Sequence, residues 1–340
     1  MTRILTLLGT GALGETATAI AQGMAARGLR VLVAQDGWGP EQDGSTGIPQ
    51  EKSPGYWTAT VKPTALLAKA WDGVKTREGD WLRTPFLQEI YGSQLALVPG
   101  MEEALALGWL REQVESGQYD EILWVGGDAR RVLRMLGLPE NLDWYLRQLR
   151  RVLSESAVGQ AIAPFVEPLL KALLVGTEDL GKQAGAAVGV LERGKQAVAD
   201  PRQVLAYLVV TPDTIAPMRY VWGSAQMIGL TVAGVLADGS LPDGALAPLP
   251  IGPLSEAAGF VLAENARCLD APKPLEIDVA RRQVRVFLPG FDKKQVKLTG
   301  FAQELAIEAG EQRRNIPLPP TFGSVSGAKF QDGYLLVSFR

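Results

Sequence analysis

The feature that most constrains the fold is a glycine-rich loop between a short apolar segment and an amphipathic segment. Residues 3–8 are almost continuously apolar, as in a strand that is buried on both faces of a parallel sheet. After the loop of residues 9–16, apolar residues recur at helical spacing as far as Gly28, which is a natural helix stop. Residues 31–34 are again apolar and predict a second buried strand. Strand, loop, helix and strand in this order predict a βαβ unit in an α/β fold with a mostly parallel sheet.

The loop has the glycine spacing of a phosphate-binding loop, G-x-x-x-x-G-K-[ST]. Gly9 and Gly14 occupy the glycine positions, and Thr16 occupies the position of the magnesium-binding hydroxyl. The lysine position, however, holds Glu15. Lysine neutralises the β- and γ-phosphates in such loops, whereas a carboxylate repels them. A purely structural reading stays open, because many α/β domains use glycines simply to turn into a helix.

Composition excludes several kinds of chemistry. The 340 residues contain no histidine and one cysteine, Cys268. Imidazole catalysis, an intrachain disulfide and a cysteine-cluster metal site are therefore excluded, and we expect no resident metal site. The apolar segment of residues 4–8 is too short for a signal peptide, and no stretch reaches the roughly 20 apolar residues of a membrane span. We therefore expect a cytoplasmic protein that is not integral to a membrane.

The loop, the segment after it and the residues RVLVA at 30–34 resemble the anion-transporting ATPases that energise arsenite pumps and the related ATPases that target tail-anchored proteins. The loop of those proteins is G-K-G-G-V-G-K-T-T. This chain keeps three of the four glycines, and Thr16, but has Thr10 and Glu15 where the two lysines belong and Ala12 for the remaining glycine. The resemblance implies a P-loop NTPase-type fold with a degenerate nucleotide-binding loop, whose residues are Gly9, Thr10, Gly11, Ala12, Leu13, Gly14, Glu15 and Thr16.

Three further positions follow from the same resemblance. Residues 119–125 are similar to the family strand that ends in a metal-organising aspartate, and Val125 stands at that position. Residues 206–238 resemble the segment that ends in an adenine-contacting asparagine, and Asp238 stands there. Asp36 lies one residue short of the position of the water-activating aspartate, so it is a weak catalytic candidate. The family uses ATP and magnesium, but these departures together predict that neither is required here.

The middle of the chain contains a predicted loop and a predicted helical region. Residues 40–63 are rich in Gly, Pro, Ser and Asp and predict a long surface loop. Residues 139–200 have helical spacing and stand where the family has a client-binding helical subdomain. The alternative, that these helices simply pack on the sheet, stays open. The client-binding candidates are Phe165, Leu169, Leu170, Leu173 and Leu174.

The C-terminal residues have a different periodicity. From Leu275, apolar residues alternate in short segments broken by Gly and Pro, which predicts a β-sandwich. The segments VRVFLPGFDKKQVKL at 284–298 and AKFQDGYLLVSF at 328–339 resemble the α-crystallin domain of small heat-shock proteins. We therefore expect a P-loop NTPase-like domain at 1–270, with its helical subdomain at about 139–200, and an α-crystallin-like domain at 272–340. The whole chain is similar to the cyanobacterial and plastid members of the targeting ATPases, which carry such a fusion.

Two functions stay open from these observations. In the first, the protein is a pseudo-ATPase that acts as a chaperone or adaptor for hydrophobic protein segments or membrane-protein clients. In the second, it is an active ATPase that energises membrane-protein targeting or anion export through noncanonical phosphate ligands. The family forms dimers, so a homodimer is conceivable, and the modest net charge of −3 gives no reason to expect nucleic acid binding.

Overall fold

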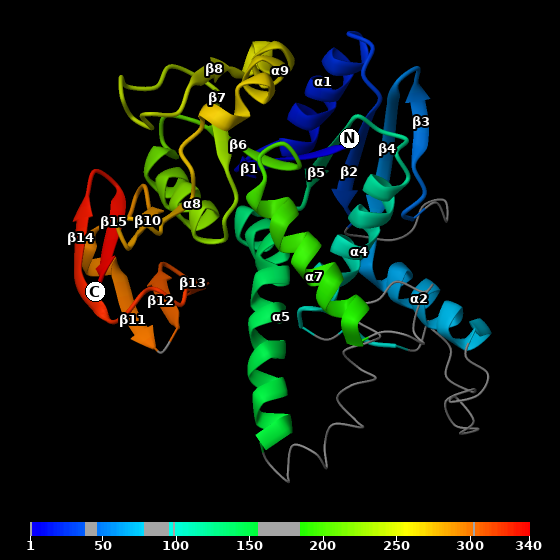
Figure 1. Cartoon of the computed structure of the whole chain (residues 1–340). Coiled ribbons are helices and arrows are strands. Elements are labelled where there is room, and N and C mark those ends of the chain that lie inside the picture. Colours follow the sequence, from blue (N-terminus) through cyan, green and yellow to red (C-terminus); the bar gives the residue numbers. More distant parts are fainter. Residues whose placement is uncertain (1, 38–45, 78–94, 98, 156–183, 302) are drawn as a thin grey trace.

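The computed structural model describes residues 2–37, 46–77, 95–97, 99–155, 184–301 and 303–340. Its larger part is an eight-stranded sheet with the strand order β3-β4-β2-β5-β1-β6-β7-β8 (Figure 1). All neighbouring strands of this sheet are parallel except β3 and β4, which are antiparallel. The predicted mostly parallel α/β sheet is thus confirmed. The strands are β1 (Arg3–Gly9), β2 (Val31–Asp36), β3 (Gln50–Ser53), β4 (Tyr56–Val61), β5 (Glu121–Val125), β6 (Val204–Val210), β7 (Val232–Ala237) and β8 (Ile251–Pro253).

Helices cover both faces of this sheet, as the continuously apolar strands require. One face packs against α1 (Leu13–Ala25) and α9 (Ala257–Ala266). The other face packs against α4 (Met101–Glu115), α5 (Ala129–Glu155), α7 (Ala184–Ala199) and α8 (Ile215–Met227). The helix α2 (Pro63–Arg77) adds Leu66 to the border of that second core.

The prediction of a surface loop for residues 40–63 was wrong over its second half. Residues 50–61 form the hairpin β3–β4, in which Gly55 makes the turn with a φ of 79°. The strand β4 pairs with β2 along its whole length, and Tyr56, Ala59 and Val61 are buried. The pairing partner is about 25 residues away in sequence, so local composition gave no sign of it. Residues 38–45 lie outside the described part of the chain.

Two helices fall in the region predicted to be helical at about 139–200. They are the C-terminal half of α5, which contains Pro139, and α7. The helices lie close together, because a Cβ at Gly194 of α7 would approach the ring of Pro139 to 3.0 Å. Residues 156–183 between them, which include all five client-binding candidates, lie outside the described residues.

The C-terminal strands form two packed antiparallel sheets, and the predicted sandwich is confirmed. Their inward side chains alternate along each strand, and Leu305, Ile307 and Val337 are fully buried. Asp332 and Gly333 both have positive φ and form the hairpin turn before the last strand. One sheet has the order β14-β15-β10-β9 and the other β11-β12-β13. The strands are β9 (Leu275–Asp278), β10 (Gln283–Phe287), β11 (Val296–Phe301), β12 (Glu304–Ala309), β13 (Gln312–Pro317), β14 (Val325–Gln331) and β15 (Tyr334–Phe339).

Candidate functional site

The glycine loop lies at the carboxyl edge of the parallel sheet, which is where open α/β sheets bind ligands. The strand β1 ends at Gly9, and α1 begins as early as Leu13. Gly11 makes the turn with a φ of 92°, and the Leu13 amide donates a hydrogen bond to the Gly11 carbonyl at 2.9 Å. The Thr16 amide donates to the Ala12 carbonyl at 3.1 Å. At least two amides of the loop are therefore bonded to the chain's own carbonyls instead of facing a phosphate.

Two of the loop glycines lie in close contact with neighbouring strands. Gly9 pairs with Val209 of β6, and a Cβ there would lie 2.6 Å from the Val209 carbonyl oxygen. Gly14 lies beneath Gln35 of β2, whose Nε2 would be 3.3 Å from an added Cβ. Close approach to the β6 backbone thus explains Gly9 without any ligand, whereas at Gly14 only the end of a flexible side chain would have to move.

Glu15 lies in the first turn of α1, and its side chain is exposed. The first turn of a helix carries a partial positive charge, which attracts anions and acidic side chains. A phosphate bound by this loop would use the same field. Glu15 therefore supplies a negative charge at the helix end where a nucleotide would place its phosphates. This charge also stabilises the helix.

The arginines nearest to the loop in sequence do not substitute for the missing lysines. Arg3 donates to the carbonyls of Arg202 and Asn265, at the amino end of β1. Arg27 and Arg30 follow the last turn of α1, and Arg30 forms an ion pair of 2.8 Å with Asp120. All three lie at the amino edge of the sheet, separated from the loop by the length of β1 or α1.

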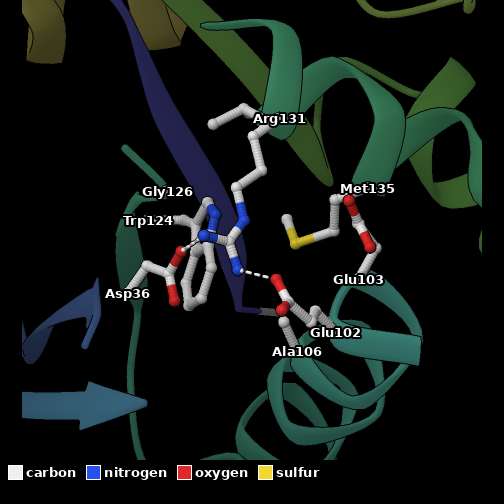
Figure 2. A pocket seen from close by; sticks show the side chains of 9 residues that line it. Asp36, Glu102, Glu103, Ala106, Trp124, Gly126, Arg131 and Met135 are labelled. Carbon is white, nitrogen blue, oxygen red and sulfur yellow. Dashed lines mark hydrogen bonds and ion pairs between the residues drawn. The ribbon is translucent and has the colours of Figure 1, made fainter. Parts of the chain in front are cut away.

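At the carboxyl ends of β2 and β5, Asp36 takes part in an ion-pair cluster (Figure 2). The guanidinium of Arg131, from the first turn of α5, lies between two carboxylates. Its Nη1 is 2.7 Å from Asp36 Oδ2, and its Nη2 is 2.6 Å from Glu102 Oε2. A second ion pair lies next to this one, in which Arg134 Nη2 is 3.3 Å from Glu103 Oε1. Asp36 is thus partly buried, and one of its carboxylate oxygens is engaged by Arg131.

The electrostatics of Asp36 agree with this geometry. Burial raises the pKa of the Asp36 carboxyl; Arg131 lowers it again, and the negative charges of Glu102 and Glu103 raise it further. The net direction is upward. A raised pKa suits a general base, but a base also needs an open path to its substrate. The cavity that Asp36, Arg131 and Trp124 help to line has a volume of about 10 Å³, enough for at most one water.

The two other positions inferred from the resemblance lie at the same edge but apart from each other. Val125 ends β5 and packs against the core between the sheet and α1. Asp238 follows β7 and is exposed, and its amide donates to the Val210 carbonyl at 2.9 Å. The strand order puts β1 and β6 between β5 and β7, so Val125 and Asp238 lie on opposite sides of the glycine loop.

Reading the sequence missed Arg131 and Glu102. A signal was available, because α5 begins at Ala129 and therefore has Arg130 and Arg131 in its first turn. Basic side chains are unfavourable at a helix N-terminus, so such a pair calls for carboxylate partners. Within the described ranges, no helix is long and apolar enough to cross a membrane.

Comparison with known proteins identifies the family. A model of the anion-transporting ATPase matches residues 48–243, and a model of the HSP20-like domain found in ArsA matches residues 280–339. The chain is 26% identical to an uncharacterized protein of Streptomyces coelicolor, with 99% of this chain and 97% of that protein covered. It is 22% identical to a putative arsenical pump-driving ATPase of Chlorobaculum tepidum, with 99% and 96% covered. The chain therefore belongs to the anion-transporting ATPase family and carries an HSP20-like domain at its C-terminal end.

Proposed function

We propose that this member of the family is a pseudo-ATPase that serves as a chaperone or adaptor for hydrophobic protein segments. The observation that carries the first half of the proposal is the negative charge of Glu15 in the first turn of α1, in a loop without lysine or arginine. The family match itself begins at residue 48, so it does not include this loop.

The described residues do not fit a magnesium-bound nucleoside triphosphate. Two unit charges about 4 Å apart interact by roughly 4 kcal/mol at an effective dielectric near 20. Replacing attraction by repulsion at position 15 therefore costs several powers of ten in affinity, even after screening. The side chain of Val125 has no oxygen to organise a metal, and Asp36 is engaged by Arg131. Each difference removes a separate contact, and we derive no catalytic step through a nucleotide.

The second half of the proposal rests on two features. The match at residues 280–339 is to the HSP20-like domain found in ArsA, and this segment resembles the α-crystallin domain of small heat-shock proteins. The region between α5 and α7 contains the five client-binding candidates Phe165, Leu169, Leu170, Leu173 and Leu174, in the place where the family resemblance puts its client-binding helices. Apolar residues at this spacing suit the capture of an apolar helix in a groove.

The Chlorobaculum relative is named as a pump-driving ATPase, which favours the alternative of an active enzyme. Equilibrium binding of ATP to the full chain, with and without magnesium, separates the two functions. We expect only weak binding of ATP and no detectable magnesium-dependent hydrolysis. Turnover that depends on magnesium and disappears in Thr16→Ala would show that the protein is an active ATPase.

A reversion experiment tests the reason for the loss. The triple variant Thr10→Lys, Glu15→Lys and Val125→Asp restores the family residues at three positions, and we expect it to gain measurable ATP affinity. The matched control is Glu51→Lys, which makes the same charge change on the exposed edge strand β3. Equal ATP binding by the control and the triple variant would refute the assignment of the loss to the loop.

Client binding is tested separately, with the full chain and a fluorescent apolar helical peptide. We expect saturable capture of this peptide and no capture of a scrambled polar peptide of equal length. Failure to capture the apolar peptide, or to slow aggregation of an unfolding model protein, would contradict the chaperone function and leave the nucleotide result unaffected.

A further inference from the structure

The C-terminal sandwich is joined to the larger unit by a shared apolar core. Trp222 of α8 packs edge-on against Phe287 of β10, with ring centroids 5.4 Å apart. Phe287 is buried in the core of the eight-stranded sheet, and Met227 of α8 is buried in the core of the sandwich. Each unit thus places a side chain in the core of the other, which is more than a surface contact between two independent domains.

Glycines allow the backbones to approach each other at this junction. Gly223 lies in the middle of α8, and a Cβ there would overlap the carbonyl oxygen of Pro289 and reach Phe291 at 2.5 Å. Gly290 has a φ of 81°, and a Cβ there would lie 2.5 Å from the carbonyl oxygen of Arg219. The fit between α8 and the segment 288–291 therefore depends on the absence of side chains on both partners.

A buried arginine adds a polar contact at the end of the same helix. Arg314 of β13 is about 9% exposed, and its Nη1 donates to the carbonyl of Gln226, in the last turn of α8, at 3.4 Å. Burial lowers the pKa of Arg314. The positive charge faces the negative end of the α8 dipole, which is the favourable arrangement.

The sandwich also contacts α5, which leads to the carboxyl edge of the sheet. Arg130 in the first turn of α5 forms an ion pair with Glu311, in the turn between β12 and β13. Further along the helix, Trp144 Nε1 donates to Glu304 Oε2 at 3.2 Å. The residue after Arg130 is Arg131, which binds Asp36. Successive side chains of one helical turn therefore bind the sandwich and the carboxyl edge.

We propose that the sandwich is a conformational brace for the carboxyl edge of the sheet. By holding α8 and α5 in place, it keeps Arg131 on Asp36, and a displacement of the sandwich loosens the edge around residues 35–37 and 126–134. The physical link is a rigid element, α5, with contacts at both sites. The brace does not depend on nucleotide binding, so it stands or falls separately from the proposed function.

The test adds a side chain at Gly223, in the contact between α8 and the sandwich. The substitution Gly223→Ala favours the helix itself but forces the sandwich away, because the new methyl group overlaps Pro289. The matched control is Gly108→Ala in α4, where an added Cβ has no neighbour within 4 Å. Amide hydrogen exchange is measured on the full chain, peptide by peptide.

For Gly223→Ala we expect exchange to rise roughly tenfold or more in the segments 288–292 and 310–316, and also at 35–37 and 126–134. Gly108→Ala leaves all four segments as in the parent protein. If exchange rose only in the two sandwich segments, the proposal would be overturned, because the sandwich would then contact α8 without affecting the carboxyl edge of the sheet.

A charge swap keeps the proposal testable if Gly223→Ala does not fold. Both residues of the Arg130–Glu311 pair are more than half exposed, so substitutions there are tolerated by the fold. Arg130→Glu and Glu311→Arg should each raise exchange at 126–134 and at 35–37, and the double variant should restore the parent values. Unchanged exchange at 35–37 in both single variants would refute the brace.

Discussion

Replacement of Glu121 by glutamine should remove a pH dependence from the stability of the protein. Glu121 begins β5 and is about 7% exposed, and its Oε2 has no hydrogen-bond partner among the described residues. Burial is the largest cause that raises the pKa of its carboxyl, to about 7; Arg3 acts in the opposite direction, and Asp120 adds to the increase. The folded protein therefore holds this proton to a higher pH than the unfolded chain does.

The sign and size of the effect follow from that difference. Because the folded-state pKa is raised above the ordinary value of 4.5, the stabilisation is complete below about pH 4.5 and is lost as the pH rises to about 7. At about 1.4 kcal/mol per pH unit, the total loss is about 3 kcal/mol. Between pH 5 and pH 8 the loss is about 2 to 3 kcal/mol, since a small part of the total has already occurred at pH 5.

The assay is urea unfolding followed by circular dichroism at pH 5 and at pH 8. Glu121→Gln should lose about 2 to 3 kcal/mol less stability over this interval than the parent protein. The control Glu51→Gln removes an exposed carboxylate from β3 and should behave like the parent protein. If Glu121→Gln and the parent protein show the same pH dependence, the buried carboxyl does not hold its proton, and the reasoning fails.

Three further predictions concern other parts of the molecule. Arg131→Met leaves the partly buried Asp36 without its cation and should cost about 2 kcal/mol in urea unfolding, more at pH 8 than at pH 5. No loss would mean that water solvates the carboxylate. Phe287→Ala should cost about 3 to 5 kcal/mol, because it opens a cavity at the shared core; a loss below about 1 kcal/mol would show that the junction is loosely packed. Leu170→Glu and Leu174→Glu should abolish peptide capture and leave the melting temperature nearly unchanged, whereas a large fall in melting temperature would place both residues in a core.

The two fold types could be predicted from the sequence because the patterns that indicate them involve residues close together in the chain. The apolar segment of residues 3–8, the glycine loop and Gly28 predict one βαβ unit, and the structure has β1, α1 and β2 there. The alternation from Leu275 and the turn at Asp332 and Gly333 predicted the sandwich in the same way. Periodicity and turn chemistry depend only on neighbouring residues, so one sequence is enough to see them.

Only part of the candidate site could be predicted from the sequence, because some of its contacts join residues that are far apart in the chain. The replacement of lysine by Glu15 is a fact of the sequence, and no structure is needed to see that the loop lacks a cation. Asp36 was noted from its position, but its ion-pair partner Arg131 is about 95 residues away and meets it only because β2 and β5 are neighbours in the sheet. The hairpin at residues 50–61 was not predicted for the same reason, because β4 pairs with β2, which is distant in the sequence.

The sequence by itself therefore determined the two fold types and the loss of the phosphate-binding charges, because these follow from residue identity and short-range spacing. The tertiary structure alone decided that Asp36 is engaged by Arg131 and that α8 and the sandwich bury side chains in each other's cores. Both are contacts between segments far apart in the chain. Their geometry depends on how closely the backbones approach, as at Gly223 and Pro289, and no local pattern encodes that distance.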